Sequence, residues 1–145
     1  MNLINVSRVG LGIATVGVAV LAFRESLLAS GLIAIAVQVA STLLMLWARL
    51  SFGIRSFHAT ADPTVGGLVT KGPYRYLRHP IYAAVLYFLW AAVLSHPDII
   101  NGLLGALITV GLAVRMVAEE RLVAERYPEY LVYAAHTKSI IPFIL

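Results

Sequence analysis

The stretch GPYRYLRHPIY, Gly72–Tyr82, interrupts an otherwise apolar chain. It brings together two prolines, three tyrosines, two arginines and a histidine, and long hydrophobic runs lie on both sides of it. Proline and glycine at these positions break regular structure, whereas the apolar runs favour helices. The sequence therefore predicts a polar turn that divides two groups of apolar helices.

The composition places the chain in a membrane. Of its 145 residues, 60% are hydrophobic and 12% are charged, and the mean hydropathy is +0.86. These values lie outside the range of soluble proteins, and the length fits a single membrane domain over residues 1–145. The net charge is +4, but so few charges offer no basic surface for nucleic acid. Without cysteine, a disulfide framework, a thiolate metal site and a cysteine nucleophile are all excluded.

Four apolar runs are candidates for membrane spans. They cover Leu3–Phe23, Leu27–Leu50, Ile81–Ser95 and Ile99–Val117. A hydrocarbon core of about 30 Å needs roughly 20 helical residues, so the third run is short unless it includes part of the preceding turn. Asp98 is a candidate N-cap for the fourth. We expect an all-α integral membrane protein with about four transmembrane helices and no Rossmann domain.

The chain also divides into two parts. Residues 1–50 would supply two N-terminal transmembrane helices, and residues 51–145 would contain two further transmembrane helices and the cytosolic C-terminal segment. After Val117 polarity rises while helical periodicity persists, so the fourth helix should extend into water up to Pro128. A short amphipathic helix then ends near Ala135. The apolar tail Ile140–Phe143 should fold back onto the protein or the membrane surface, as part of a fifth amphipathic or re-entrant segment.

The first run has two competing interpretations. A charge before an apolar segment is typical of a signal peptide, but no small-residue cleavage site follows, which favours a retained helix. Gly10-Leu11-Gly12 resembles a dinucleotide loop, yet it follows no strand. We expect Gly10 and Ala14, four residues apart, to let a neighbouring helix approach closely.

Three polar residues interrupt the second run. Gln38, Ser41 and Thr42 either form hydrogen bonds to a neighbouring helix or the preceding turn, or line a substrate channel. The first alternative is the more common one.

Basic residues predict the orientation. The segment Arg49–Arg78 contains five Lys or Arg residues, the chain after Val117 contains three, and Ser95–Asn101 contains none. By the positive-inside tendency both basic segments and both termini are cytoplasmic, and Arg24 is the one contrary sign. The two polar segments would then share one aqueous side and could build one site.

Arg115 and Glu119 are the strongest chemical candidates. Four residues apart, they share one helical face, while Glu120 projects about 100° away. The alternative is a simple ion pair at a helix end. An arginine facing lipid would be costly, however, so Arg115 should face the bundle interior, where ionisable groups are usually functional.

The sequence gives less support to a metal site or to a catalytic nucleophile. His58, His79, His96 and His136 are far apart and have no ligand-like spacing, so no metal site is predicted. No serine or threonine lies in a nucleophile motif. Lys71, Arg75 and Arg78 could contact lipid phosphates, as juxtamembrane cations commonly do.

Two separated motifs carry a resemblance to a known family. LVTKGPYRYLRHPIY and, further on, RMVAEERLVAERYPEYLVYAAHTKSIIPFI resemble the isoprenylcysteine carboxyl methyltransferase and phospholipid methyltransferase superfamily of membrane enzymes. The shared pattern is a GPY-R-x-x-RHP-x-Y turn, a Glu-Glu pair at a helix end and a Y-x-x-Y segment. It covers Leu68 to Phe143. One departure is Ala84, where the family often has glycine.

The resemblance implies a function and a set of site residues. It implies an S-adenosylmethionine-dependent methyltransferase, with the cofactor bound on the cytoplasmic side of a prokaryotic cytoplasmic membrane and a lipid or amphipathic acceptor arriving from the bilayer. Arg115 and Glu119 would be catalytic. The cofactor-binding residues would be Tyr74, Arg78, His79, Pro80, Tyr82 and Glu120.

The acceptor stays open at this point. A carboxylate, as in isoprenylcysteine O-methylation, would need positioning by Arg115, and we favour this alternative. An amine, as in phospholipid N-methylation, would need Glu119 as a base. S-methylation of a small thiol is a third possibility. A different class of protein, a small four-helix transporter or scaffold, would use Glu25 or Arg115 as its embedded charge.

Overall fold

The computed structural model describes residues 2–53 and 67–141 of the chain. The described residues form helices α1 (Leu3–Phe23), α2 (Leu32–Phe52), α3 (Pro80–Ser95), α4 (Ile99–Arg126) and α5 (Tyr130–His136), and a short 3-10 helix, η2 (Gly72–Arg75). The predicted all-α class is confirmed. Arg55, His58 and Asp62 of the basic segment, and Pro142 and Phe143 of the tail, lie outside the described residues.

Within the described ranges, three helices are long and apolar enough to cross a membrane: α1, α2 and α4. Helix α3 is apolar but has 16 residues, about 24 Å at ~1.5 Å per residue. It adds one residue of the preceding turn, Pro80, to the predicted run and begins there, because proline lacks the N–H that would extend the helix backwards. Helix α4 has 28 residues, about 42 Å, so it runs beyond a hydrocarbon core as predicted.

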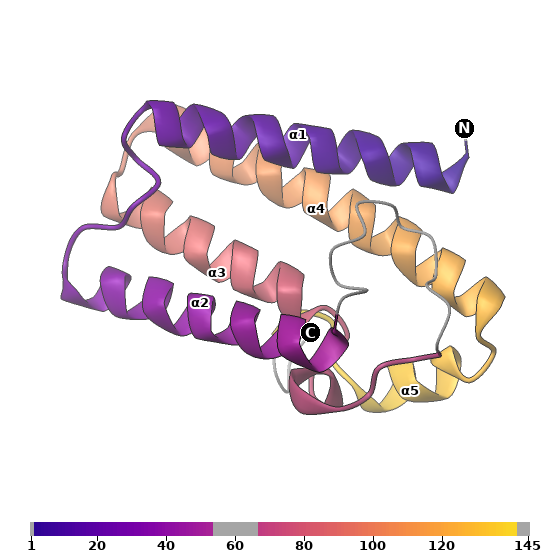
Figure 1. Cartoon of the computed structure of the whole chain (residues 1–145). Coiled ribbons are helices and arrows are strands. Elements are labelled where there is room, and N and C mark those ends of the chain that lie inside the picture. Colours follow the sequence, from indigo (N-terminus) through magenta and orange to yellow (C-terminus); the bar gives the residue numbers. More distant parts are fainter. Residues whose placement is uncertain (1, 54–66, 142–145) are drawn as a thin grey trace.

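The helices pack as two antiparallel pairs, α1 with α4 and α2 with α3 (Figure 1). Glycines bring the first pair together: a Cβ on Gly10 would lie 2.4 Å from the carbonyl oxygen of Gly111, and one on Gly17 would overlap Ile108. The predicted close approach at Gly10 is confirmed, and Ala14 lies buried on the same face. Ala14, Leu21, Leu86, Leu89 and Ile108 belong to the core between the pairs.

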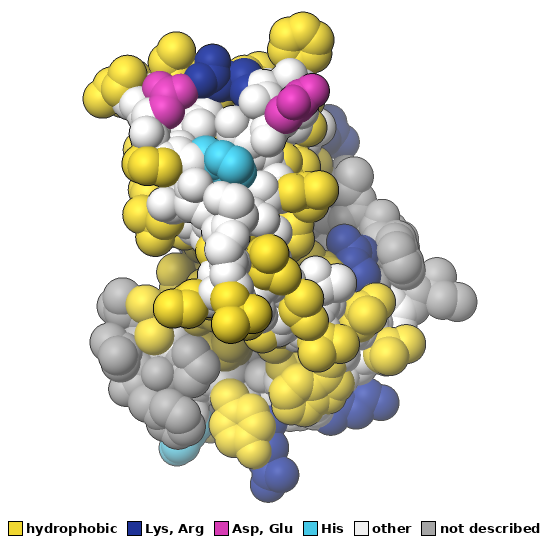
Figure 2. Space-filling view, turned by 90° about the vertical axis from the view of Figure 1, so that its left-hand side faces the viewer, with side chains coloured by type: hydrophobic (Ala, Val, Ile, Leu, Met, Phe, Trp, Pro, Cys, Tyr) yellow, Lys and Arg dark blue, Asp and Glu magenta, His cyan; other side chains and the backbone are white. Residues whose placement is uncertain are grey.

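At one end of the molecule, the α1–α2 and α3–α4 connections lie side by side, and their few charged groups gather among hydrophobic side chains (Figures 1 and 2). Arg24 forms an ion pair with Asp98 and donates to the Asn101 side chain at 3.0 Å. Asp98 also caps α4 by accepting from the Ile100 N–H at 2.8 Å, as predicted.

The predicted start of the second helix was wrong. Leu27 was expected to begin it, but α2 begins at Leu32, after Gly31 with φ 88°. The preceding residues form a connection held by Gln38, whose side chain donates to the Leu27 carbonyl oxygen at 2.9 Å and the Phe88 carbonyl oxygen at 3.2 Å. This confirms the hydrogen-bonding interpretation of Gln38. Leu27 and Leu28 are apolar like the helix itself, so the hydrophobic pattern placed the start of α2 five residues too early.

Ser41 and Thr42 also follow the hydrogen-bonding interpretation. Each hydroxyl donates to a carbonyl oxygen one turn back in α2, at 2.7 Å to Val37 and 2.9 Å to Gln38. These bonds account for both hydroxyls, and the two residues also line a pocket between α2 and α3.

Candidate functional site

The Gly72–Tyr82 turn lies against the end of α2, opposite the connections just described (Figure 1). Gly72 has φ 61°, and a Cβ there would overlap the Ser51 side chain, so only glycine fits. Pro73 is the second residue of η2, and the Tyr74 ring packs on Phe52 with 5.5 Å between ring centroids. The contacts of Gly72 and Tyr74 thus fix the turn to α2 just before the chain continues into α3.

The segment after α5 pairs with this turn. Leu77 and Lys138 form a parallel bridge, in which the Arg78 N–H donates to the Lys138 carbonyl oxygen at 2.7 Å. The His79 N–H donates to Ser139 at 3.0 Å. The tail continues onto α3, because the Tyr87 hydroxyl donates to the carbonyl oxygen of Ile140. The described part of the tail thus folds back onto the protein, as expected, and fixes the backbone of Arg78 and His79.

Glu120 connects the end of α4 to the turn. Its Oε1 atom lies 3.0 Å from Arg78 Nε and 2.9 Å from His79 Nε2. Tyr130 also forms a hydrogen bond with this carboxylate, and burial raises the pKa of the Tyr130 phenol. Arg78 reaches further, with Nη1 donating to the carbonyl oxygen of Ala134 at 2.6 Å. A single carboxylate therefore holds the turn, α4 and α5 together.

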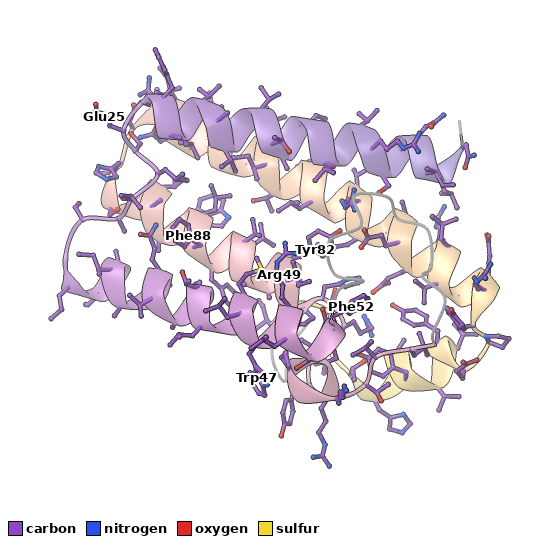
Figure 3. All side chains as sticks on the ribbon, viewed as in Figure 1. Glu25, Trp47, Arg49, Phe52, Tyr82 and Phe88 are labelled. Carbon is purple, nitrogen blue, oxygen red and sulfur yellow. The ribbon has the colours of Figure 1, made fainter. Side chains whose placement is uncertain are left out.

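Arg115, Tyr82 and Glu119 form a second network one turn deeper. Arg115 Nε donates to the Tyr82 hydroxyl at 2.6 Å, and that hydroxyl donates to Glu119 Oε1 at 2.7 Å. Arg115 Nη2 lies 3.0 Å from the same carboxylate oxygen. Arg115 is 5% exposed, which confirms that it faces the bundle interior. Figure 3 shows Tyr82 at the beginning of α3 on the inner side.

One nitrogen of the buried Arg115 guanidinium has no hydrogen-bond partner in the described part of the chain. Among the described residues, Arg115 Nη1 and the hydroxyl of Ser7 are the buried side-chain atoms without a hydrogen-bond partner. Ser7 is 0% exposed and lies one turn from Gly10, on the face of α1 that meets α4 beside Arg115. Buried donors are normally paired, so an unpaired one next to this charged network calls for a ligand or a water.

The two networks adjoin each other. The rings of His79 and Tyr82 lie 5.7 Å apart between centroids, and Glu119 and Glu120 are consecutive on α4. Of the eight predicted site residues, these two networks contain Arg78, His79, Tyr82, Arg115, Glu119 and Glu120. Pro80 is buried at the start of α3 between them.

Tyr74 lies at the edge of the site. Its side chain packs on Phe52, and its carbonyl oxygen accepts from the Tyr133 hydroxyl at 2.6 Å. Burial raises the pKa of Tyr133 to about 12, so its hydroxyl stays protonated and continues to donate. Burial raises the pKa of Tyr74. The charge of Arg49, on α2 (Figure 3), lowers that pKa but by less than burial raises it.

Sequence reasoning did not assign Tyr130, Tyr133 or Ser7 to the site. The two tyrosines were visible as a Y-x-x-Y pair that shares one helical face. Ser7 had no such signal, because a serine in an apolar helix commonly bonds to its own backbone.

Metal ligands are not gathered here. No group of three His, Cys, Asp or Glu side chains that could hold an ion occurs within residues 2–53 and 67–141. Glu25, the acidic residue on which a transporter would depend, is exposed at the α1–α2 connection (Figure 3).

Comparison with known proteins gives one match. The model of the phospholipid methyltransferase family matches residues 26–130, more than two thirds of the chain, including α2, α3, α4 and the turn between them. Helix α1 lies before the matched region. Comparison with curated proteins and with solved structures found no match. The chain therefore belongs to the phospholipid methyltransferase family, a family of membrane methyltransferases.

Proposed function

We propose that this protein transfers a methyl group from S-adenosylmethionine to a lipophilic or small amphipathic acceptor, and that a carboxylate is the favoured acceptor group. The observation that carries the proposal is the Arg115 side chain, which is buried beside Tyr82 and Glu119 and, within the described part of the chain, keeps Nη1 without a partner. An acceptor carboxylate would pair with that nitrogen.

The residues present fit the methyl donor. S-adenosylmethionine carries a sulfonium and an ammonium, which favour carboxylates and aromatic faces, and a carboxylate, which favours arginine or backbone N–H groups. Glu120, Tyr130 and His79 are clustered at the aqueous end of α4, with Arg78 beside them. We assign Tyr74, Arg78, His79, Pro80, Tyr82 and Glu120 to the cofactor. When bound, the cofactor would supply an electrophilic methyl group.

The protein must also align the acceptor with the methyl group of the cofactor. Methyl transfer is an in-line displacement, so the acceptor must be held at a fixed distance and angle while water is excluded. Arg115 is suited to this because Tyr82 and Glu119 restrain its guanidinium from two sides. A carboxylate acceptor is already ionised at neutral pH and needs no base.

Phospholipid N-methylation is the second candidate, and the description of the matching family favours it. An amine acceptor must lose a proton, and Glu119 would then be the base. In the structure Glu119 Oε1 already accepts from Arg115 and Tyr82. These contacts occupy one of the two carboxylate oxygens, which is why we place this candidate second.

We further propose that the site faces the cytoplasm of a prokaryotic cell. Arg75, Arg78 and Lys138 lie at the site end of the helices, as do Arg121 and Arg126. At the opposite end Arg24 is neutralised by Asp98. This asymmetry matches the positive-inside tendency, with both termini inside. Residues 51–145 would be the catalytic region of a single domain that α1 and α2 support.

Two measurements test the proposal. Calorimetry on detergent-purified protein should show binding of S-adenosylmethionine and S-adenosylhomocysteine. A transporter or scaffold would bind neither. Turnover with labelled cofactor should then be compared across prenylcysteine analogues, phosphatidylethanolamine and small thiols. Transfer to the amine alone would favour phospholipid N-methylation over the carboxylate.

A further inference from the structure

Ser7 of α1 is a buried polar residue to which the proposed function gives no role. Its side chain is 0% exposed, and in the described part of the chain its hydroxyl has no hydrogen-bond partner. Serine and threonine in apolar helices commonly donate to a carbonyl oxygen one turn back, as Thr15 of the same helix does to Leu11 at 2.8 Å. Ser7 lacks this bond, so its hydroxyl is free to bind a ligand.

The packing of α1 on α4 places Ser7 beside the charged end of Arg115. A Cβ on Gly10 would lie 3.4 Å from the backbone nitrogen of Arg115. The two helices are antiparallel, so one turn from Gly10 back to Ser7 leads toward the carboxyl end of α4 (Figure 1). The guanidinium extends the same way, because Nη2 lies 3.0 Å from Glu119, one turn further along α4. Ser7 and the guanidinium therefore lie at the same level of the two helices.

The two unpaired atoms define what could bind between them. Arg115 Nη1 only donates hydrogen bonds, whereas the Ser7 hydroxyl donates or accepts. They bond neither to each other nor to another described group. One carboxylate oxygen can accept from both, and the bond from the guanidinium is stronger to a carboxylate than to a neutral oxygen.

Both atoms are closed to solvent in the ligand-free protein, so an acceptor must move part of α1 to reach them. Helix α1 packs along its length on α4 and, within the described ranges, far less on α2 or α3. Ser7 lies in the second turn of α1. An outward shift of these first turns would open the space beside Arg115 to the bilayer, while the contact of Gly17 with Ile108 further along stays in place.

We propose that Ser7 is a binding residue for the methyl acceptor, and that its hydroxyl and Arg115 Nη1 together hold one oxygen of the acceptor carboxylate. The inference rests on the proposed function, which places the acceptor at Arg115. The second carboxylate oxygen stays free to accept the methyl group. Ser7 precedes the matched residues 26–130, so helix α1 would add to the acceptor site a group that the family match does not include.

The test compares Ser7→Ala with Thr15→Ala. Both substitutions remove a hydroxyl from α1, but Thr15 is exposed and its hydroxyl is bonded within the helix. Calorimetry in the presence of S-adenosylhomocysteine measures the affinity for N-acetyl-S-prenylcysteine and for its neutral carboxamide. Ser7→Ala should weaken carboxylate binding by about tenfold, the effect of losing one hydrogen bond to a charged group, and carboxamide binding by less. The affinity for S-adenosylhomocysteine should not change, and Thr15→Ala should change none of these affinities.

Thermal unfolding of the ligand-free protein separates binding from a structural role. Ser7→Ala removes an unpaired buried hydroxyl and introduces a residue that favours helix, so the unfolding temperature should stay the same or rise. Ser7→Cys keeps the size of the side chain and a weak donor, so its carboxylate affinity should lie between those of Ser7→Ala and the unmodified protein. A lower unfolding temperature of Ser7→Ala together with weaker binding would assign Ser7 to helix packing and overturn the inference.

Other outcomes would also overturn it. Equal carboxylate affinity in Ser7→Ala and the unmodified protein would mean that the hydroxyl does not bind the acceptor. Equal weakening by Thr15→Ala, or no carboxylate binding to the unmodified protein, would lead to the same conclusion. Methyl transfer with the same KM in Ser7→Ala and the unmodified protein would keep the proposed function and reject the role of Ser7. Carboxylate binding that depends on Ser7 without any methyl transfer would support the site and reject the proposed function.

Discussion

Replacing Arg115 with alanine separates acceptor positioning from cofactor binding. Arg115 contacts Glu119 and the hydroxyl of Tyr82, whereas Arg78 and His79, which we assign to the cofactor, contact Glu120. Tyr82 belongs to both groups, because we assign its ring to the cofactor. We expect Arg115→Ala to lower kcat by about 10²–10³-fold, the effect of losing one fixed donor in an enclosed site. The affinity for S-adenosylmethionine should stay within about threefold of the unmodified value.

The stability cost of this substitution is also predictable. Removing one partner of a buried ion pair costs about 3–5 kcal/mol when the other stays dry. The Glu119 side chain is 21% exposed, so water reaches it, and we expect a cost of about 2 kcal/mol. Thermal unfolding in detergent measures this cost, and calorimetry measures cofactor affinity.

Arg121→Ala is the matched control, since Arg121 is an exposed arginine further along α4. It should leave turnover, cofactor affinity and unfolding temperature close to those of the unmodified protein. Loss of cofactor affinity in Arg115→Ala equal to its loss of turnover would refute the separation of roles. Unchanged turnover would refute the acceptor assignment.

Four further substitutions test the site and the packing of α1 on α4. Tyr82→Phe keeps the ring but removes the hydroxyl between Arg115 and Glu119, so kcat should fall about tenfold at nearly constant cofactor affinity; equal loss of both would contradict this. Glu120→Ala should abolish calorimetric binding of S-adenosylmethionine, and retained binding would remove this carboxylate from the cofactor site. Gly10→Ala should cost about 1–3 kcal/mol in thermal unfolding because its Cβ overlaps a carbonyl oxygen of α4. Gly12→Ala, where no described atom lies within 4 Å of the new Cβ, should instead stabilise α1 by up to about 1 kcal/mol, and equal effects would refute the packing argument.

Much of the fold could be predicted because each apolar run carries its own helix signals. The start of α3 follows from Pro80, and the start of α4 follows from the Asp98 cap. The start of α2 could not be read in this way. Leu27 and Leu28 are apolar like the helix, and the contact that ends the connection, from Gln38 to Phe88, joins residues far apart in sequence.

The site was predictable in part. The cost of exposing a charge to lipid correctly predicted a buried Arg115. The family resemblance singled out residues that the structure brings into two adjoining networks. The pairing of Leu77 with Lys138 and the position of Ser7 beside α4 arise from contacts between distant segments, and no local pattern encodes them.

The nature of the methylated group tests most directly whether the protein transfers methyl to a lipophilic carboxylate held at Arg115. Detergent-purified protein should be incubated with methyl-labelled S-adenosylmethionine and a prenylcysteine analogue, and the lipid product then treated with alkali. A carboxyl methyl ester releases labelled methanol, whereas N-methyl and S-methyl products keep their label. We expect a labelled product that alkali cleaves and that Arg115→Ala fails to form. A label that resists alkali, or no label from protein that is folded by circular dichroism, would contradict it.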